Sequence, residues 1–212
     1  MPMPIQTLLS EVRLVPVVRL DELASATRLA DALLAGGLPL AEITLRTPIA
    51  LSAIETLAQR DDIAVGAGTV LNRSQAADCI QAGARFVVSP GLDPELVTYC
   101  QDRGVPVFPG VSSASEIQAA YNLGLRQVKY FPAEASGGVT SLKALAAPFH
   151  QMQFIPTGGI HPDNLLDYLH LDCTLAVGGS WMVKPALYAS GDFSQVTDLT
   201  RAAVAMAKRN DD

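Results

Sequence analysis

Lys129 is the first residue whose surroundings suggest chemistry. It lies in the stretch QVKYFPAEASGG, between the apolar neighbours Val128 and Tyr130. Lysine is almost never fully buried unless it has a partner or a task. If the stretch is a β-strand, its side chains alternate between two faces, so Lys129 and Phe131 share one face while Val128 and Tyr130 share the other. The pattern predicts a lysine that points into the fold, with snorkelling to solvent at its rim as the alternative.

A carboxylate on an earlier apolar segment could serve that lysine. In LAEITLR, Glu42, Thr44 and Arg46 alternate with apolar residues and therefore share one strand face. A buried carboxylate needs a partner or a function, and an ion pair with Arg46 is the purely structural alternative. If Lys129 faces Glu42, its loss of hydration and the like charge of Arg46 favour the neutral amine. Such an amine can attack a ketone to form a Schiff base, and the carboxylate can carry protons.

Paired glycines end two later segments and offer a site for an anion. Backbone N–H groups exposed before a helix suit a phosphate, although a glycine pair can also mark only a tight turn. The residues concerned are Thr157, Gly158, Gly159, Gly178, Gly179 and Ser180. His161 follows the first pair and is predicted to cap a helix that begins at Pro162, rather than to take part in catalysis.

The stretch VGAGTV is not a dinucleotide-binding fingerprint, because it lacks the third glycine and the distal acidic residue. Thr69 is instead predicted to place a hydroxyl at the end of its strand, next to Arg46.

Eight short apolar segments must position these residues. They recur every 21 to 26 residues and begin at Leu14, Leu40, Ile63, Ala84, Val105, Arg126, Met152 and Cys173. Strands this apolar are typical of a parallel sheet that is buried on both faces. Eight strands alternating with helices predict a single (β/α)8 TIM barrel with an extra terminal helix over residues 192–208. An open doubly wound sheet is the alternative. In a barrel, chemistry lies at the C-terminal ends of the strands, where the polar residues above collect.

The helices between the strands have recognisable ends. Thr47-Pro48 and Asp93-Pro94 each predict an N-cap followed by proline at the first helical position. Ser113 followed by Glu116 predicts a capping box. Glycines are expected where helices stop, at Gly36, Gly83, Gly104 and Gly124.

The bulk properties exclude several classes of protein. The 212 residues predict one domain spanning 1–212, and a net charge of −6 argues against nucleic acid or an anionic membrane as a partner. No apolar run has the length of a membrane span, and the N-terminus lacks signal-peptide features. Three scattered cysteines without a CxxC motif predict reduced thiols in a cytoplasmic protein. The three histidines, His150, His161 and His170, show no metal-ligand spacing, so no metal site is expected.

Together these segments resemble the class I 2-keto-3-deoxy-6-phosphogluconate (KDPG) and 4-hydroxy-2-oxoglutarate (KHG) aldolases. The motifs that carry the resemblance, in chain order, are EITLRT, GAGTVLN, VSPGL, FPGVSSASE, KYFPAEASGG, PTGGI and GGSWMV. They extend over nearly the whole chain. The resemblance implies a (β/α)8 barrel that assembles as a homotrimer in the cytoplasm and needs no metal or other cofactor.

The resemblance also implies roles for single residues. Lys129 matches the Schiff-base lysine and Glu42 the general acid/base. Arg46 and Thr69 match residues that hold the pyruvyl carboxylate, and Phe131 matches an aromatic wall beside the lysine. The residues that match the site of the rest of the substrate and its phosphate are Thr157, Gly158, Gly159, Gly178, Gly179 and Ser180. Arg19 ends the first strand and is expected either to bind substrate or to form a salt bridge at the rim.

The activity implied is reversible cleavage of KDPG to pyruvate and glyceraldehyde 3-phosphate in the Entner–Doudoroff pathway, with a side activity on 4-hydroxy-2-oxoglutarate. Cleavage of 2-keto-3-deoxy-6-phosphogalactonate remains an alternative. So does a different enzyme on a phosphate-binding barrel, with Lys129 as a phosphate clamp, or a catalytically silent binding protein.

Overall fold

The computed structural model describes residues 3–208, in which strands and helices alternate along the chain. The strands are β1 (Leu14–Val18), β2 (Leu40–Thr44), β3 (Ala64–Gly68), β4 (Val87–Val88), β5 (Val107–Phe108), β6 (Gly110–Val111), β7 (Gln127–Tyr130), β8 (Gln153–Pro156) and β9 (Val177–Gly179). The α-helices are α1 (Ile5–Val12), α2 (Ser25–Ala35), α3 (Ala50–Ala58), α4 (Arg73–Gln81), α5 (Pro94–Asp102), α6 (Ala114–Asn122), α7 (Gly138–Ala146), α8 (Pro162–Leu169) and α9 (Ser194–Lys208). Two 3₁₀ helices, η1 (Trp181–Val183) and η2 (Pro185–Leu187), follow β9.

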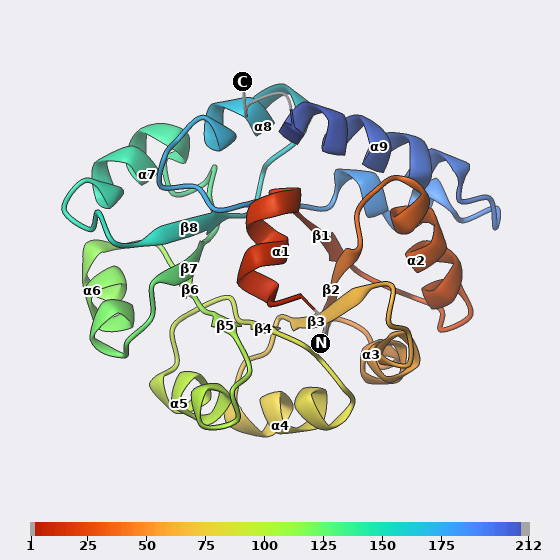
Figure 1. The fold of residues 1–212 in the computed structure, drawn as a ribbon, viewed down its shortest axis with the longest axis horizontal. Coiled ribbons are helices and arrows are strands. Elements are labelled where there is room, and N and C mark those ends of the chain that lie inside the picture. Colours follow the sequence, from red (N-terminus) through yellow and green to blue (C-terminus); the bar gives the residue numbers. More distant parts are fainter. Residues whose placement is uncertain (1–2, 209–212) are drawn as a thin grey trace.

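The strands form parallel sheets with helices around the outside (Figure 1). One sheet has six strands in the order β5-β4-β3-β2-β1-β9, and a second has three in the order β6-β7-β8. Isolated parallel bridges from Phe154 to Thr174 and from Thr157 to Gly178 link β8 to the segment that contains β9. The α/β class and the parallel strands are as predicted. Strands β1 to β5 follow one another in chain order, without the reversal that characterises a doubly wound sheet.

The fifth apolar segment does not form the single strand expected from Val105 onward. It is divided into β5 and β6, which are separated by Pro109. Proline has no backbone N–H and cannot donate to a strand ladder. Its carbonyl still accepts a hydrogen bond from the Lys129 N–H (2.9 Å), so the chain remains beside β7.

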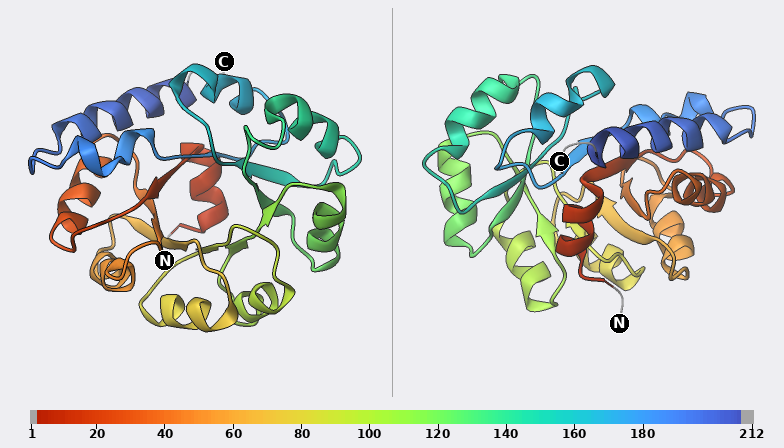
Figure 2. Two further views of the ribbon diagram at one scale, coloured as in Figure 1. Left: turned by 180° about the vertical axis from the view of Figure 1, so that it is seen from behind. Right: turned by 45° about the horizontal axis from the view of Figure 1, so that its top comes forward.

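Helix α1 was not predicted from the sequence. It lies at one end of the strands and inside the ring of outer helices (Figures 1 and 2). It ends at Val12, just before β1 begins, and buries Ile5, Leu8 and Leu9. These side chains join an inner cluster of buried residues that lie on the strands or directly before them, which comprise Val15, Leu40, Ala64, Phe86, Val88, Phe108, Ile155, Leu175 and Ala176. Burying a leucine or isoleucine side chain stabilises a fold by about 1.5–3 kcal/mol. The helix therefore supplies part of the core beneath the strand ends that carry the polar residues.

Alternation along the strands separates the two faces as expected. Leu40 on β2 packs in the inner cluster, while Ala41 and Ile43 pack in the outer core against the helices. Val128 and Tyr130 on β7 also belong to the outer core. Residues between them on the same strands must therefore face the interior.

Helix ends agree with the sequence in most places. Asp93 caps α5 by accepting a hydrogen bond from the Glu95 N–H, with Pro94 as the first helical residue. Ser113 caps α6 and accepts from the Glu116 N–H (3.4 Å), but the Glu116 carboxylate accepts from the N–H of Ser112 rather than that of Ser113. This contact holds the pKa of Glu116 below its ordinary value.

The predicted start of α3 at Thr47-Pro48 is wrong. The helix begins at Ala50, and Thr47 and Pro48 form a preceding turn in which the Ala50 N–H donates to the Thr47 carbonyl (3.2 Å). The four predicted glycines lie where helices stop. Gly36 is the C-cap of α2, and Gly83, Gly104 and Gly124 follow the C-caps of α4, α5 and α6 with positive φ. After α2 the positive φ occurs at the next residue, Gly37 (φ 87°).

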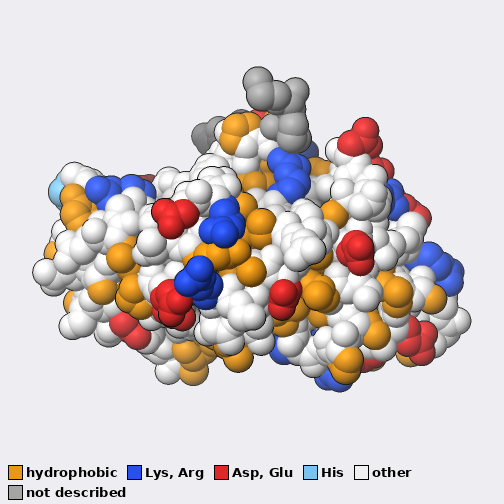
Figure 3. All heavy atoms as spheres, turned by 90° about the horizontal axis from the view of Figure 1, so that it is seen from below, with side chains coloured by type: hydrophobic (Ala, Val, Ile, Leu, Met, Phe, Trp, Pro, Cys, Tyr) orange, Lys and Arg blue, Asp and Glu red, His pale blue; other side chains and the backbone are white. Residues whose placement is uncertain are grey.

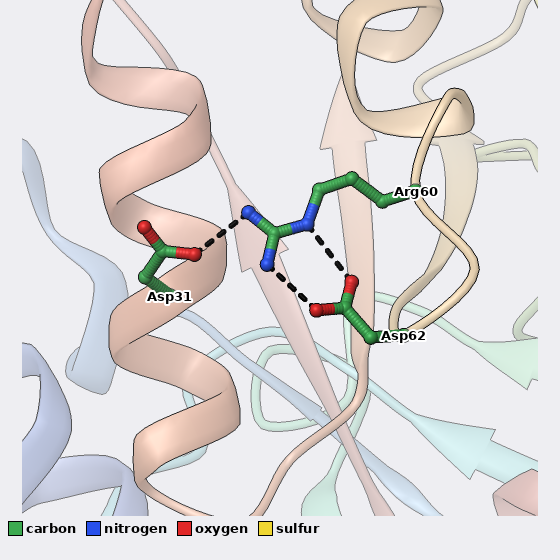
Figure 4. A network of polar contacts seen from close by, with 3 residues as sticks. All are labelled: Asp31, Arg60 and Asp62. Carbon is green, nitrogen blue, oxygen red and sulfur yellow. Dashed lines mark hydrogen bonds and ion pairs between the residues drawn. The ribbon is translucent and has the colours of Figure 1, made fainter.

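The outer surface carries charges of both signs interleaved with apolar side chains, as the face over α4 and α5 shows (Figure 3). One network ties α2 to the loop before β3: Arg60 donates to Asp31 (2.7 Å) and forms a two-pronged pair with Asp62 (2.8 Å) (Figure 4). Among the described residues, no helix has the length and apolar character that crossing a bilayer requires.

Candidate active site

Lys129 and Glu42 meet in the interior. The Lys129 Nζ lies 3.6 Å from the Glu42 Oε1, and the two side chains are 8% and 3% exposed. Their strands are not neighbours, because β7 pairs with β6 and β8 whereas β2 pairs with β1 and β3. The contact therefore spans the space that the strands enclose, and the predicted inward orientation of both residues is confirmed.

The surroundings of this pair are almost wholly apolar. Leu9, Val15, Phe86, Val88, Phe108 and Ile155 line the small cavity that also contacts Glu42, Lys129 and Thr157. Removing an ion pair from water costs several kcal/mol for each ion, which only a close partner offsets. The structure thus selects between the alternatives for Glu42, since its partner is Lys129. Arg46 makes a different contact, in which its Nε donates to the Thr44 Oγ1 (3.0 Å).

The Glu42 carboxylate is not fully satisfied. Its Oε1 is buried without a hydrogen bond, and its separation from Lys129 exceeds a normal N–H···O distance. A buried acceptor without a donor costs about 1–3 kcal/mol. Such a group is ready to accept a proton from a ligand that enters beside it.

Gly68 makes room for this carboxylate, a role that was not predicted from the sequence. A Cβ at Gly68 would lie 2.2 Å from the Glu42 Oε1, far inside van der Waals contact. Gly66, two residues earlier on the same face, leaves equivalent room for the Phe86 ring. The two glycines in VGAGTV are spaced two residues apart, which indicates that one face of the strand has no side chains at these two positions. The sequence does not show which side chains fill the space that they leave.

Arg46 and Thr69 lie at the ends of β2 and β3. The Thr44 hydroxyl, which accepts from Arg46, donates to the Val18 carbonyl on β1 (2.6 Å), so the guanidinium is held by a chain of contacts. Thr69 has φ 58°, which is a rare conformation for a β-branched residue. Strain of this kind gathers at functional sites and costs about 1–3 kcal/mol.

Phe131 lies beside the lysine, with its ring centroid 5.0 Å from the Lys129 Nζ. It begins the loop that leaves β7. Gly158 lies against this loop, since a Cβ there would be 3.4 Å from the Phe131 ring.

The two glycine pairs are adjacent in space. Thr157 bridges to Gly178, and a Cβ at Gly178 would lie 2.2 Å from the Thr157 Oγ1. Gly158 and Gly159 have positive φ, which glycine adopts without strain. Gly179 packs beneath the Trp181 indole, and Ser180 precedes η1 on the surface.

Arg19 takes the second of its two expected arrangements. It forms an ion pair with Asp21 (2.9 Å) in which both side chains are about half exposed, at 54% and 47%. No contact places it with Glu42 or Lys129 among the residues that the structure describes.

His161 caps α8 as predicted, and its N–H donates to the Asn164 Oδ1 (2.8 Å). Within residues 3–208, no cluster of three or more histidine, cysteine or acidic residues is arranged to hold a metal ion. Cys79, Cys100 and Cys173 are free thiols, and burial raises the pKa of Cys79 to about 12 and that of Cys100 to about 11.

Comparison with known proteins adds independent information. Residues 5–199 match the KDPG and KHG aldolase family. The chain is 48% identical over 194 residues to 2-dehydro-3-deoxy-phosphogluconate aldolase of Treponema pallidum, covering 91% of this chain and 92% of that protein. It is 44% identical over 204 residues to KHG/KDPG aldolase of Escherichia coli K12, covering 96% of each.

A solved structure extends the likeness to three dimensions. It is KDPG aldolase from Legionella pneumophila, in which pyruvate was captured at low pH as a covalent carbinolamine intermediate. The TM-score is 0.91 at 40% identity, over 95% of this chain and 98% of that one.

Proposed function

Because the chain belongs to the KDPG and KHG aldolase family, we propose that it is a class I aldolase that cleaves KDPG reversibly to pyruvate and glyceraldehyde 3-phosphate. The reaction is a step of the Entner–Doudoroff pathway and makes the protein a carbon–carbon lyase. The observation that carries the proposal is the buried approach of the Lys129 Nζ to the Glu42 Oε1 at 3.6 Å. An amine and a carboxylate in an apolar interior are the two groups that imine chemistry requires.

Lys129 is the nucleophile. Its neutral amine attacks the C2 ketone of the sugar acid to form a carbinolamine. The carbinolamine hydroxyl takes up a proton from solvent and leaves as water, which gives a protonated imine, and the later hydrolysis releases that proton again. The C3–C4 bond then breaks, and its electron pair passes into the imine to form an enamine. Phe131 walls the pocket beside the reacting nitrogen.

Glu42 carries the protons. It accepts the C4 hydroxyl proton as the aldehyde leaves, and returns a proton to C3 of the enamine. Water then hydrolyses the imine, which releases pyruvate and the free amine. The Glu42 Oε1 supports this role, because it is buried and no hydrogen-bond donor occupies it.

Arg46 and Thr69 bind the carboxylate of the substrate. A guanidinium can pair with a carboxylate through two parallel hydrogen bonds, which fixes the orientation of the ketone. Thr44 braces the Arg46 side chain for this task.

The rest of the substrate and its phosphate lie along the two glycine-containing loops. This assignment rests on the family resemblance and on the position of the two loops side by side at the strand ends, where Thr157 bridges to Gly178. The residues concerned are Thr157, Gly158, Gly159, Gly178, Gly179 and Ser180. Arg19 stands at the rim and could contact the phosphate only by leaving Asp21.

We also propose that the two sheets close into one (β/α)8 barrel, formed by a single domain over residues 1–212. The two sheets meet at two places. Between β5 and β6 only Pro109 separates the sheets, and between β8 and β9 the isolated bridges connect them. The functional form is a cytoplasmic homotrimer, which follows from the family resemblance alone. Sedimentation of the purified protein tests the trimer.

A coupled assay tests the function and its alternatives together. Lactate dehydrogenase reports pyruvate as it forms from KDPG, from 2-keto-3-deoxy-6-phosphogalactonate or from 4-hydroxy-2-oxoglutarate. We expect the highest kcat/KM with KDPG and slower release from hydroxy-oxoglutarate. Preference for the galactonate would reassign the substrate, and release of pyruvate from none would leave a phosphate-binding barrel of another function.

A further inference from the structure

The loop that leaves β7 is bound to the first glycine loop. The Ala133 N–H donates to the Thr157 carbonyl (2.8 Å), and the Glu134 N–H donates to the Gly158 carbonyl (3.1 Å). The strand that carries Lys129 is thereby joined, five residues later, to the backbone assigned to the distal half of the substrate. These two bonds continue the β7–β8 ladder, in which the Thr157 N–H donates to the Tyr130 carbonyl (2.9 Å), and all of these are backbone contacts.

Glu134 adds a side-chain constraint to this junction. Its Cβ and Cγ lie over Gly159, where an added Cβ would be 2.7 Å from both atoms. Its Oε1 accepts a hydrogen bond from the Tyr168 hydroxyl on α8, 34 residues along the chain. Tyr168 is completely buried, whereas Glu134 lies on an exposed part of the loop. A fixed tyrosine thus holds a carboxylate that would otherwise be mobile.

The Tyr168 hydroxyl is the donor in this contact. Burial, followed by the Glu134 contact, holds the pKa of Tyr168 well above its ordinary value. A hydrogen bond from a buried hydroxyl to a carboxylate is about twice as strong as a neutral one.

We propose that Glu134 and Tyr168 are positioning residues that hold the Thr157–Gly159 loop in register with Lys129, and so determine affinity for the distal, phosphate-bearing half of the substrate. This inference rests on the proposed function. Neither residue touches the Lys129–Glu42 pair, whose strands are held by their own ladders. Chemistry on pyruvate alone should therefore not depend on them.

The test compares two reactions in each variant. Tyr168→Phe keeps the buried ring and removes the hydroxyl. We expect its KM for KDPG to rise roughly tenfold, the effect of losing a hydrogen bond to a charged group. Exchange of pyruvate methyl protons for deuterium, followed by NMR, should stay within about twofold of the wild-type rate, because it uses only the pyruvate half of the site.

Two further variants separate positioning from loss of fold. Glu134→Gln keeps an oxygen acceptor for Tyr168 and should retain most of the affinity for KDPG. Glu134→Ala should raise the KM for KDPG as much as Tyr168→Phe does. Tyr121→Phe is the control, because its hydroxyl bonds to Gln151 on the outer surface (3.0 Å), and it should change neither reaction.

The outcomes are distinguishable. An unchanged KM for KDPG in both Tyr168→Phe and Glu134→Ala, in an enzyme whose wild type cleaves KDPG, overturns the positioning role and leaves the proposed function standing. A parallel loss of pyruvate exchange and KDPG cleavage in both variants also overturns it, since that result indicates general disruption. If the wild type exchanges no pyruvate protons, the proposed function itself fails.

Discussion

Substitution of Gly68 by alanine should disable proton transfer while sparing imine formation. The added Cβ would lie 2.2 Å from the Glu42 Oε1, 2.7 Å from its Cγ and 2.8 Å from its Cδ. Ordinary contact begins near 3.4 Å, so the carboxylate must withdraw by about 1.2 Å, the difference between these distances. The strand backbone is held against such a movement by the β2–β3 ladder and by the hydrogen bond that the Gly68 carbonyl accepts from the Leu45 N–H (2.8 Å).

The size of the effect follows from this displacement. A misplacement of about 1 Å in a catalytic group can lower a rate by roughly 100-fold. We therefore expect Gly68→Ala to slow the exchange of pyruvate methyl protons by about 10- to 100-fold. Lys129 lies on a different strand and should still form an imine with pyruvate, which borohydride traps.

The assay pairs these two readouts in one preparation. Proton exchange is followed by NMR, and imine formation by mass spectrometry after borohydride reduction. Gly91→Ala is the matched control, because an added Cβ there meets nothing within 4 Å and should leave both readouts unchanged. An exchange rate within twofold of wild type in Gly68→Ala would refute the claim that the position of Glu42 sets proton transfer.

Three other perturbations test separate parts of the account. Arg46→Lys keeps the charge but loses the two-pronged pair, so we expect roughly tenfold weaker pyruvate binding by calorimetry; unchanged affinity would remove Arg46 from the carboxylate site. Leu9→Ala leaves a cavity beneath the reactive pair and should lower the free energy of unfolding in urea by about 2–5 kcal/mol, whereas a loss below 1 kcal/mol would show that α1 is dispensable. Burial raises the pKa of Cys79 from 9.0 to about 12, so the folded protein holds this proton more tightly than the unfolded chain. That contribution is complete below about pH 9 and is lost as pH rises toward 12; the fall in stability should be shallower in Cys79→Ala, and an identical slope would contradict it.

The orientation of Lys129 and Glu42 could be predicted because it depends on local alternation. Strands buried on both faces leave few choices for a charged side chain, and the period of two fixes which face it occupies. Contacts between segments that are distant in the sequence could not be predicted in the same way. The room that Gly68 leaves for Glu42, and the contact between Glu134 and Tyr168, arise only when distant segments meet.

Two local features were not predicted although the sequence contained a signal for each. Helix α1 carries Ile5, Leu8, Leu9 and Val12 at the spacing of an amphipathic helix, and this period was a usable signal. The break between β5 and β6 at Pro109 could also have been predicted, because proline has no N–H to donate to a strand ladder.

Covalent trapping of pyruvate tests the central claim most directly. The chain has four lysines, of which Lys129 is buried, whereas Lys143, Lys184 and Lys208 are exposed. Incubation with pyruvate and borohydride, followed by digestion and mass spectrometry, should place the adduct on Lys129 alone. Lys129→Ala should abolish the adduct, and Lys143→Ala should leave it intact. An adduct on another lysine, or none at all with Lys129 unmodified, would contradict the assignment of this residue as the Schiff-base nucleophile.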